Sequence, residues 1–433
     1  MRGLFLRTPW QIVLVALLIR MLLIIPEHRY IVNPSKDHFR FGWEMGRVAQ
    51  SLAAGKGFSS PYGGETGPTA TLPPVYPCLL AGVFRLFGIY TVASAYVILI
   101  LNSIFSALTC WAVYFIARET IGETVALLSA WIWAFIHPAL LFSTRVVWET
   151  TLTTFLLSLA VLLALRLKQV KSFWHWLVFG MICGLGTLSN SAVVSVVPLL
   201  FVWLWWRNRT NEILWLVGVG IMGFLLTLTP WVVRNYVVFH KVIPFRTNFG
   251  LEFQIGNNLQ ATGHQVFDLH PSHSAREFDD YRSMGETEYM GRKKREAQQF
   301  IQAHPGDFMF LTLKRTALWW VEGWEISGDT PLTSAGAVAE LLGYSLFSGI
   351  TFLGLALALR SGQADALLFG GLLVFYPLVY YVTVVNSRMR HPLEPFMLIL
   401  TVYALQQTLF KKKSPEPSPP TEFRRKVLAE IVR

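Results

Sequence analysis

The chain has 433 residues, of which 53% are hydrophobic and only 15% are charged, and its mean hydropathy is +0.45. This composition excludes a soluble globular protein, because a bilayer core of roughly 30 Å needs about 20 apolar residues per helical span and such stretches recur along the chain. The formal net charge of +11 does not indicate nucleic-acid binding, since much of it lies in short turns, where Lys and Arg set membrane topology.

About ten transmembrane helices are predicted in chain order. The first covers Thr8 to Ile25, a long stretch that contains Arg20 and is followed by no small-residue cleavage site, so it is read as a retained helix. The others are expected at 92–117, 121–143, 149–167, 173–189, 191–206, 213–233, 337–359, 366–385 and 393–410. Residues 74–89 are apolar but short and interrupted by prolines, which favours an interfacial helix over a span.

Lys and Arg in short loops indicate the orientation, because such loops stay cytoplasmic. Arg2 and Arg7 place the N-terminus in the cytoplasm. With ten spans, the same side receives Arg118, Arg166, Lys168, Lys171, Arg207, Arg209, Arg360 and Lys411 to Lys413. The external side receives a first loop over 26–91, a long loop over 234–336 and short turns near 145, 190 and 386–392. Residues 1–410 are thus predicted to form one transmembrane module, followed by a basic, Pro-rich cytoplasmic tail over 411–433 that lies against anionic lipid.

The sequence supports neither a disulfide framework nor the common metal-protease and nucleotide-dependent mechanisms. The three cysteines, Cys78, Cys110 and Cys183, lie far apart in apolar surroundings and are expected to be packing residues. No HExxH, Walker or GxGxxG pattern occurs in a suitable context, so a metalloprotease or a nucleotide-dependent transferase is not expected.

A charged segment follows the first span almost immediately. Asp37, Arg40, Glu44 and Arg47 share one face if this stretch is helical, because they are spaced three or four residues apart. The helix is expected to end near Gly55. Ionisable groups at membrane depth are expensive and usually mark a site or pathway, although Glu44 could instead pair with Arg40 or Arg47 on a solvated helix surface.

Further polar clusters are predicted on the same external side. Arg145 and Glu149 flank the start of the span 149–167 and are spaced for an ion pair, which could serve a site or simply close a helix end. Pro230 and Trp231 are expected to end the span 213–233, so that Arg234 enters the long loop.

The remaining clusters lie later in the chain. Asn257 and Asn258 could bind sugar or form a turn. Arg388, Arg390 and His391 crowd the turn before the last span, where external arginines run against the positive-inside preference; they could bind phosphate or anchor the chain at the interface. An amphipathic helix over about 286–303, ended by a His-Pro pair, is expected to lie over the bundle.

Taken in order, these segments resemble a known superfamily. They are the first loop with AAGKGF and PPVYP, LTPWVVRNYVVF followed by IGNN, GETEYMGRKKREAQQFIQAHP, and RMRHPLEP. They are similar to the bacterial relatives of protein O-mannosyltransferases and of the aminoarabinose transferases, which belong to the GT-C superfamily of membrane glycosyltransferases. The resemblance covers most of residues 10–410. It implies a GT-C type bundle with external loop helices in a bacterial inner membrane, with the site facing the periplasm.

The resemblance also implies an inverting transfer from a polyprenyl-phosphate sugar, with an acidic residue of the first external loop near the reaction centre. An acceptor hydroxyl needs a carboxylate to take its proton, which Glu44 or Asp37 could supply. The resemblance favours Glu44 over Asp37, because counting back from the turn at Gly55 to Phe58 puts Glu44 near the position where the related chains carry their loop-one acid. The departing lipid phosphate needs an arginine. The candidates are Arg388, Arg390, Arg234 and Arg145, and the expected substrate-binding residues are Arg40, Glu149, His391, Asn257 and Asn258.

The expected partners are the lipid-linked donor, membrane lipid and an acceptor that could be lipid, glycan or protein. No metal is required, although Asp37 with Glu44 could contribute ligands to a divalent cation. The rival reading is a secondary transporter or lipid flippase of the cell envelope, and a third is a noncatalytic envelope-assembly subunit. An enzyme is favoured because the two halves of the chain are not alike and the charges concentrate on one face.

Overall fold

The computed structural model of the protein describes residues 8–25, 41–208, 211–322 and 335–409. Regular structure within these ranges is helical, apart from one isolated antiparallel bridge between Ser59 and Pro68. The predicted all-α class is thus confirmed for the described part of the chain.

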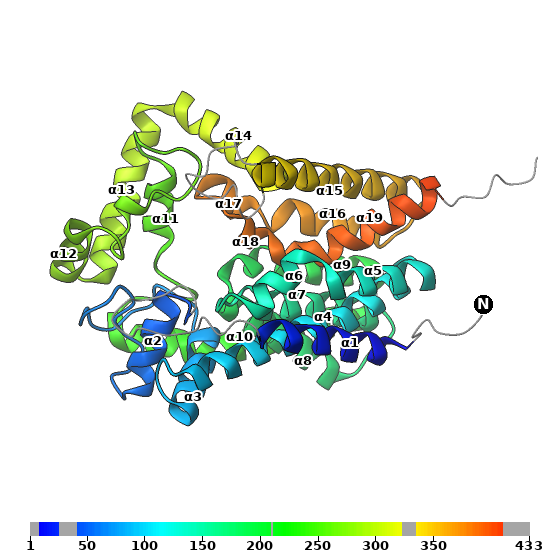
Figure 1. The fold of residues 1–433 in the computed structure, drawn as a ribbon, viewed down its shortest axis with the longest axis horizontal. Coiled ribbons are helices and arrows are strands. Elements are labelled where there is room, and N and C mark those ends of the chain that lie inside the picture. The colour runs from blue at the N-terminus through cyan, green and yellow to red at the C-terminus, as the bar shows by residue number, and fades with distance from the viewer. Residues whose placement is uncertain (1–7, 26–40, 209–210, 323–334, 410–433) are drawn as a thin grey trace, which may run out of the picture.

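Most of the apolar helices lie side by side in one bundle (Figure 1). Its members are α1 (Pro9–Ile24), α4 (Val92–Thr120), α5 (Glu123–Phe135), α6 (His137–Thr144), α7 (Thr150–Leu167), α8 (Phe173–Ser189), η2 (Ser191–Ser195), α9 (Val197–Asn208), α10 (Asn211–Phe239), α15 (Ala335–Arg360), α16 (Ala366–Phe375), α17 (Leu378–Val382), α18 (Ser387–Arg390), η4 (His391–Leu393) and α19 (Glu394–Leu409). Each predicted span coincides with one of these helices or with a pair of them.

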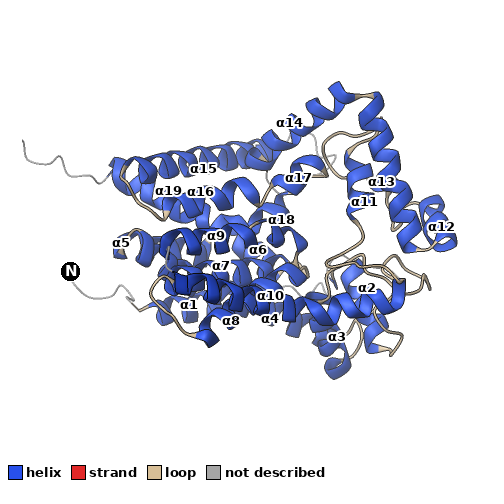
Figure 2. Ribbon diagram, turned by 180° about the vertical axis from the view of Figure 1, so that it is seen from behind, coloured by secondary structure: helices blue, strands red, loops and turns tan. Residues whose placement is uncertain are grey.

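A second group of helices gathers at one end of the bundle, as the front and back views agree (Figure 2). It contains α2 (Glu44–Ala53), α3 (Val75–Phe87), α11 (Phe249–Gly256), η3 (Phe267–Leu269), α12 (Ala275–Met284) and α13 (Glu286–Ala303), and we call this group with its loops the head. The amphipathic helix predicted at 286–303 is α13, and α14 (Pro305–Val321) leads from it back to the bundle.

The expected count of about ten spans is not confirmed. Among the described helices, five are long and apolar enough to cross a membrane: Val92–Thr120, Thr150–Leu167, Ser191–Asn208, Glu212–Phe239 and Ala335–Arg360. A sixth results if α5 and α6, which meet at a 47° bend, are one broken span. Pro138 near the start of α6 explains the break, because proline lacks the N–H that would continue the helical ladder. Four shorter apolar helices, Pro9–Ile24, Val75–Phe87, Phe173–Ser189 and Ala366–Val382, correspond to further predicted segments, whereas α19, at the predicted span 393–410, belongs to neither group.

The structure corrects two predictions about helices, namely the end of α10 and the charged helix face before α2. α10 does not end at Pro230 and Trp231 but continues to Phe239, since Trp231 packs inward and its Nε1 donates to the Phe245 carbonyl, 2.7 Å away. The single charged face expected over 37–47 is also interrupted. Gly42 and Trp43 have φ values of +78° and +48°, so a helix does not continue through them and α2 begins at Glu44. Its predicted end near Gly55 is confirmed, because α2 stops at Ala53.

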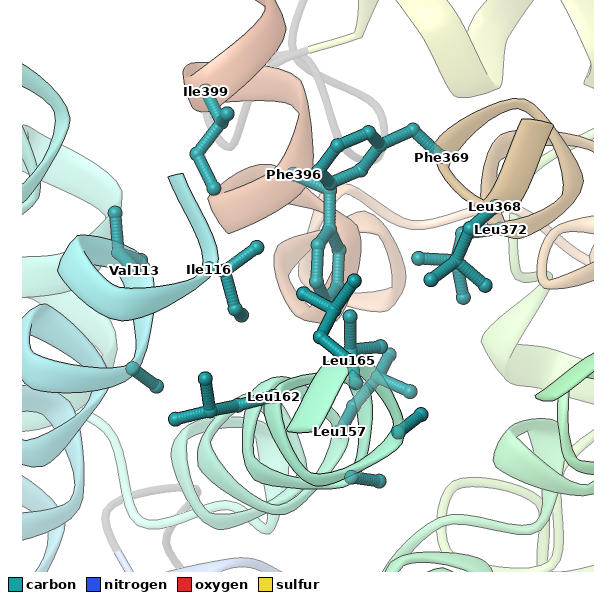
Figure 3. Packing of buried hydrophobic residues seen from close by; sticks show 14 of the residues in the cluster. Val113, Ile116, Leu157, Leu162, Leu165, Leu368, Phe369, Leu372, Phe396 and Ile399 are labelled. Carbon is teal, nitrogen blue, oxygen red and sulfur yellow. The ribbon is translucent and has the colours of Figure 1, made fainter. Parts of the chain in front are cut away.

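The bundle core joins helices from both ends of the sequence (Figure 3). Val113 and Ile116 of α4 and Leu162 of α7 lie in one buried cluster with Phe369 of α16 and Phe396 of α19. Burying such side chains contributes roughly 1.5–3 kcal/mol each. This packing joins α4 and α7 to α16 and α19.

One charged residue is buried inside the apolar bundle. Arg20 of α1 is 0% exposed. Its guanidinium donates to the carbonyl oxygens of Ala16, Ala134 and Trp133 and to Ser106 Oγ. Because these acceptors satisfy its donors, Arg20 ties α1 to α4 and α5 rather than marking a site.

Candidate functional site

Glu44 lies at the start of α2, on the side of the head that faces the bundle loops. Its Oε1 accepts a hydrogen bond of 2.9 Å from Ser272 Oγ, and Ser272 Oγ in turn accepts one of 3.1 Å from Arg47 Nη1. His270 Nε2 lies 4.0 Å from the same carboxylate oxygen. His270 Nδ1 accepts a bond from the Ser272 N–H, so in the neutral ring Nε2 carries the proton and faces Glu44. The carboxylate is therefore oriented but keeps an open oxygen.

Glu44 opens into a cavity of about 200 Å³, which we call the Glu44 pocket. Side chains from four separate parts of the chain line it: Trp43, Glu44, Trp148, Gln265, Phe267, His270, His273, Asn386 and Arg388. Two of the residues predicted to carry the chemistry, Glu44 and Arg388, thus line the same cavity although they are far apart in the sequence.

Arg388 also lines a second, smaller cavity of about 50 Å³, which we call the Arg246 pocket. Its lining consists of Glu149, Thr150, Asn190, Arg246, Glu252, Tyr380, Thr383, Val384, Arg388, Met389 and Pro392. The Arg388 guanidinium carbon lies 4.1 Å from the centroid of the Trp148 ring, a cation–π contact. Asn386 caps the short helix α18 by accepting from the Arg388 N–H. Arg388 therefore stands where the two pockets meet.

Glu149 is a buried member of the Arg246 pocket, with 9% of its surface exposed. Its Oε1 accepts a 3.2 Å hydrogen bond from Asn190 Nδ2, whereas its Oε2 has no partner. The ion pair expected between Arg145 and Glu149 is not formed in the described structure: Arg145 is exposed at the end of α6 and lines neither pocket. Glu149 is therefore a pocket carboxylate with one oxygen held by Asn190 and the other without a partner.

Two other predicted phosphate ligands are held by the protein itself. Arg390 is 1% exposed and donates to the carbonyl oxygens of Trp319 and Glu322 at 2.7 and 2.9 Å. Arg234 donates to the carbonyls of Thr69 and Phe58 at 2.7 and 2.8 Å. Both guanidinium groups stabilise loops, and neither residue lines the Glu44 pocket or the Arg246 pocket.

The remaining described candidates also lie outside these two pockets. His391 is buried, its Nδ1 lies 2.6 Å from Glu394 Oε2, and its ring stacks on Trp133. Asn257 is 0% exposed and binds the Val382 carbonyl and the Arg315 guanidinium. Asn258 accepts from the Gln260 N–H in a turn. These side chains are engaged in packing and turn formation.

Asp37 and Arg40 lie outside the described residues. Over the described ranges, no group of three or more His, Cys, Asp or Glu side chains is arranged to hold a metal ion.

A further carboxylate of the head is fully engaged. Glu286 at the start of α13 accepts hydrogen bonds from the hydroxyls of Thr69, Thr71, Thr247 and Tyr281 and from the Ala70 N–H. These donors come from the first loop, the segment after α10 and α12. Burial, with Glu286 as the next cause, raises the pKa of Tyr281 well above its usual value, so the phenol stays a donor to Glu286. Glu286 thus links the first loop, the segment after α10 and α12 to α13 within the head.

Several pocket residues were not singled out from the sequence. Trp148, Arg246, Glu252, His270 and His273 line the two pockets, yet all lie in turns or in the long polar loop, where such residue types are common. The His-Pro-Ser-His run at 270–273 is the signal that could have identified two of them. Burial lowers the pKa of His273 below its ordinary 6.5, and His270 adds to the shift, so the His273 ring is mainly neutral at pH 7.

Comparisons with known proteins concern the family and the fold of the chain. Residues 71–233 match the family model described as dolichyl-phosphate-mannose-protein mannosyltransferase. A search of curated protein sequences finds no significant match.

Among solved structures, the oligosaccharyltransferase of Archaeoglobus fulgidus in the apo form is 15% identical with a TM-score of 0.57, over 98% of this chain and 52% of that chain. The oligosaccharyltransferase AglB from Archaeoglobus fulgidus, in complex with an inhibitory peptide and a dolichol-phosphate, is 14% identical with a TM-score of 0.55, over 98% of this chain and 54% of that chain. The chain spans about half the length of these structures, and at this identity the likeness concerns the fold. The family match over residues 71–233 and the shared fold agree with the resemblance to the GT-C superfamily of membrane glycosyltransferases.

Proposed function

We propose that the protein transfers a sugar from a polyprenyl-phosphate carrier to an acceptor hydroxyl by a single, inverting displacement. The observation that carries the proposal is that Glu44, a carboxylate with an open oxygen, and Arg388, a guanidinium stacked on Trp148, line one cavity. Acid–base chemistry and phosphate binding are thereby available at the same place.

In the proposed reaction the acceptor oxygen attacks the anomeric carbon of the sugar. The bond between that carbon and the phosphate oxygen breaks, and its electron pair leaves with the lipid phosphate. Glu44 takes the hydroxyl proton, and Arg388 stabilises the charge that develops on the phosphate. Asp37 is the second candidate for the base, because it belongs to the same loop. Our proposal requires no metal ion.

The location of the reaction is also a proposal. The positive-inside distribution of Lys and Arg favours cytoplasmic termini and puts the head on the external side of the membrane. In a bacterial inner membrane the site would face the periplasm and receive its donor from the outer leaflet. The matched family and AglB, which was solved with a dolichol-phosphate, support a lipid-phosphate donor.

The test is a transfer assay with purified protein in lipid vesicles, radiolabelled polyprenyl-phosphate sugars and a membrane extract as acceptor source. Glu44→Gln keeps the size of the side chain and an oxygen for Ser272 but removes the base, so transfer should fall about 10²–10⁴-fold. Glu288→Gln is the matched control, because Glu288 is exposed on α13 outside both pockets.

The proposal fails if both Glu44→Gln and Asp37→Asn retain transfer. A flippase would instead move labelled lipid across the vesicle membrane without changing it chemically. Mass analysis of envelope glycans and lipids from cells with and without the gene would then identify the sugar and the acceptor.

A further inference from the structure

The Arg246 pocket contains positive and negative groups that do not neutralise each other. Within the described part of the chain, no hydrogen bond or ion pair occupies the side chain of Arg246 or of Arg388. On the carboxylate side, Glu149 Oε2 and Glu252 Oε2 are buried oxygens without a partner. A buried acceptor without a donor destabilises the fold, so an arrangement of this kind is typical of a site that a ligand completes.

The charges restrict the ligand. A simple anion would meet the arginines but would be repelled by two carboxylates, and a simple cation would meet the carboxylates but would be repelled by two guanidinium groups. The ligand that fits carries an anionic group for the arginines and hydrogen-bond donors for the glutamates. A glycosyl phosphate has both, because its phosphate oxygens are anionic and its ring carries hydroxyl groups.

We propose that the Arg246 pocket binds the glycosyl phosphate head group of the donor, with Arg246 and Arg388 holding the phosphate and Glu149 and Glu252 accepting hydrogen bonds from sugar hydroxyls. This inference rests on the proposed function and adds Arg246, Glu149 and Glu252 to the donor site as recognition residues.

The two cavities divide the head group between them. A volume of about 50 Å³ is too small for a whole sugar ring, whereas the Glu44 pocket offers about 200 Å³. Arg388 lines both cavities, so a phosphate bound beside it puts the sugar ring at the boundary between them. Some of the sugar hydroxyls then reach Glu149, and the anomeric carbon lies toward Glu44. The aromatic lining of the Glu44 pocket, Trp43, Trp148 and Phe267, suits the apolar face of a sugar.

Asn190 supports this assignment. Its Nδ2 holds one oxygen of Glu149, and its Oδ1 accepts from the Ala192 N–H. The carboxylate is thereby fixed with its other oxygen unpartnered. A site that binds a hydroxyl in this way discriminates against an analogue lacking it, because the buried oxygen is then left without a donor.

Binding measurements on the full-length protein in lipid nanodiscs separate the two roles. The probes are decaprenyl phosphate and the same lipid carrying mannose. Arg246→Gln should weaken both ligands at least about tenfold, because it removes a charge-assisted contact to the phosphate. Glu149→Gln and Glu252→Gln should weaken only the mannosyl lipid, by about threefold to tenfold, and leave decaprenyl phosphate unchanged.

The matched controls are Arg276→Gln and Glu288→Gln, because both residues are exposed in the head. Arg246→Lys, which keeps the charge but loses the planar fork, should fall between wild type and Arg246→Gln. The thermal stability of every variant is measured first, so that a loss of binding in a folded variant is distinguished from unfolding. Wild-type affinity of folded Arg246→Gln for decaprenyl phosphate would overturn the phosphate role, and equal losses for both lipids in Glu149→Gln would overturn the sugar role.

The outcome is distinguishable from a failure of the proposed function. Glu44→Gln should bind both lipids like wild type and lose only transfer. If wild-type protein shows Arg246-dependent lipid binding but no transfer, the donor pocket stands and the reaction is wrong. If Glu44-dependent transfer occurs while Arg246→Gln keeps its KM for the donor, the reaction stands and the pocket assignment is wrong.

Discussion

Glu286 and Glu44 are both carboxylates at the first turn of a head helix, yet their surroundings are opposite. Glu286 accepts five hydrogen bonds, from Thr69, Ala70, Thr71, Thr247 and Tyr281. Glu44 accepts one, from Ser272, and faces a cavity. A carboxylate saturated by donors of its own chain holds structure together, whereas one left open can exchange protons with a ligand.

The arginines of α18 differ in the same way over a distance of two residues. Arg390 is buried against the end of α14, where two carbonyls accept its protons, and its Nε lies 3.6 Å from Glu394 Oε1. Arg388 instead stacks on Trp148 at the junction of the two pockets. Charged residues in the sequence therefore indicate where polar interactions form. The hydrogen-bond partners of each side chain decide whether its role is structural.

The largest expected effect is that of Glu286→Ala on stability. The substitution leaves several buried donors without an acceptor, so we expect a loss of about 3–5 kcal/mol and release of the first loop from α13. Thermal melting in detergent and protease sensitivity of residues 56–71 measure it. Glu288→Ala, two residues along the same helix, should change stability by less than about 0.5 kcal/mol, and equal melting of the two variants would show that Glu286 is not a structural centre.

The next largest effects are expected for substitutions of Arg390 and Arg388. Arg390→Gln should lower stability by about 2–4 kcal/mol, because the carbonyls of Trp319 and Glu322 lose their donor and Glu394 loses a neighbouring cation. Arg388→Gln should melt like wild type but raise the KM for the lipid donor at least about tenfold. Melting and donor titration are measured on both variants. A stability loss in Arg388→Gln that matches Arg390→Gln would remove the distinction between them.

The helices could be predicted in large part from the sequence, for physical reasons visible in particular elements. Long apolar runs predicted α4, α7 and α15, and the bounds of α13 followed from its amphipathic pattern and the His304-Pro305 end. The continuation of α10 beyond Pro230 could not be predicted, because it depends on the packing of Trp231 against residues that follow it in the chain. Tertiary contacts overrode the local signal there.

The site was only partly predictable. Glu44 and Arg388 stood out because charges are rare in this chain, but the sequence does not indicate which of Arg388 and Arg390 turns toward a cavity. That choice depends on the Asn386 cap and on the carbonyls at the end of α14. Arg246 and Glu252 gave no signal, because charged residues are common in a polar loop and only the fold brings them beside Glu149.

The contact between Trp148 and Arg388 allows a finer test of how Arg388 contributes to donor binding. Replacing it with Leu removes the ring beneath Arg388 and should weaken donor binding by about threefold to tenfold, since an aromatic–guanidinium contact is worth roughly 0.5–2 kcal/mol. Trp148→Phe keeps an aromatic face and should recover most of the affinity. Donor KM is the measurement, and equal values for the Leu and Phe variants would show that the aromatic face contributes nothing specific.

The smallest expected effect concerns His273, whose ring makes a tilted contact with Trp43 and an edge contact with Phe267, with centroids 4.9 and 5.0 Å away. Burial and then His270 lower its folded pKa below 6.5, with Glu44 and Asp268 acting in the opposite direction and Arg47 in the same one. The unfolded chain therefore binds more protons, so stability falls as the pH drops from about 6.5 through the lowered folded value. His273→Asn cannot take up this proton and should lose less melting temperature than wild type between pH 7 and pH 5. The difference should be a few degrees at most, because the ring is exposed on one side. Parallel melting curves for the two proteins across this range would show that the pocket does not lower the pKa of His273.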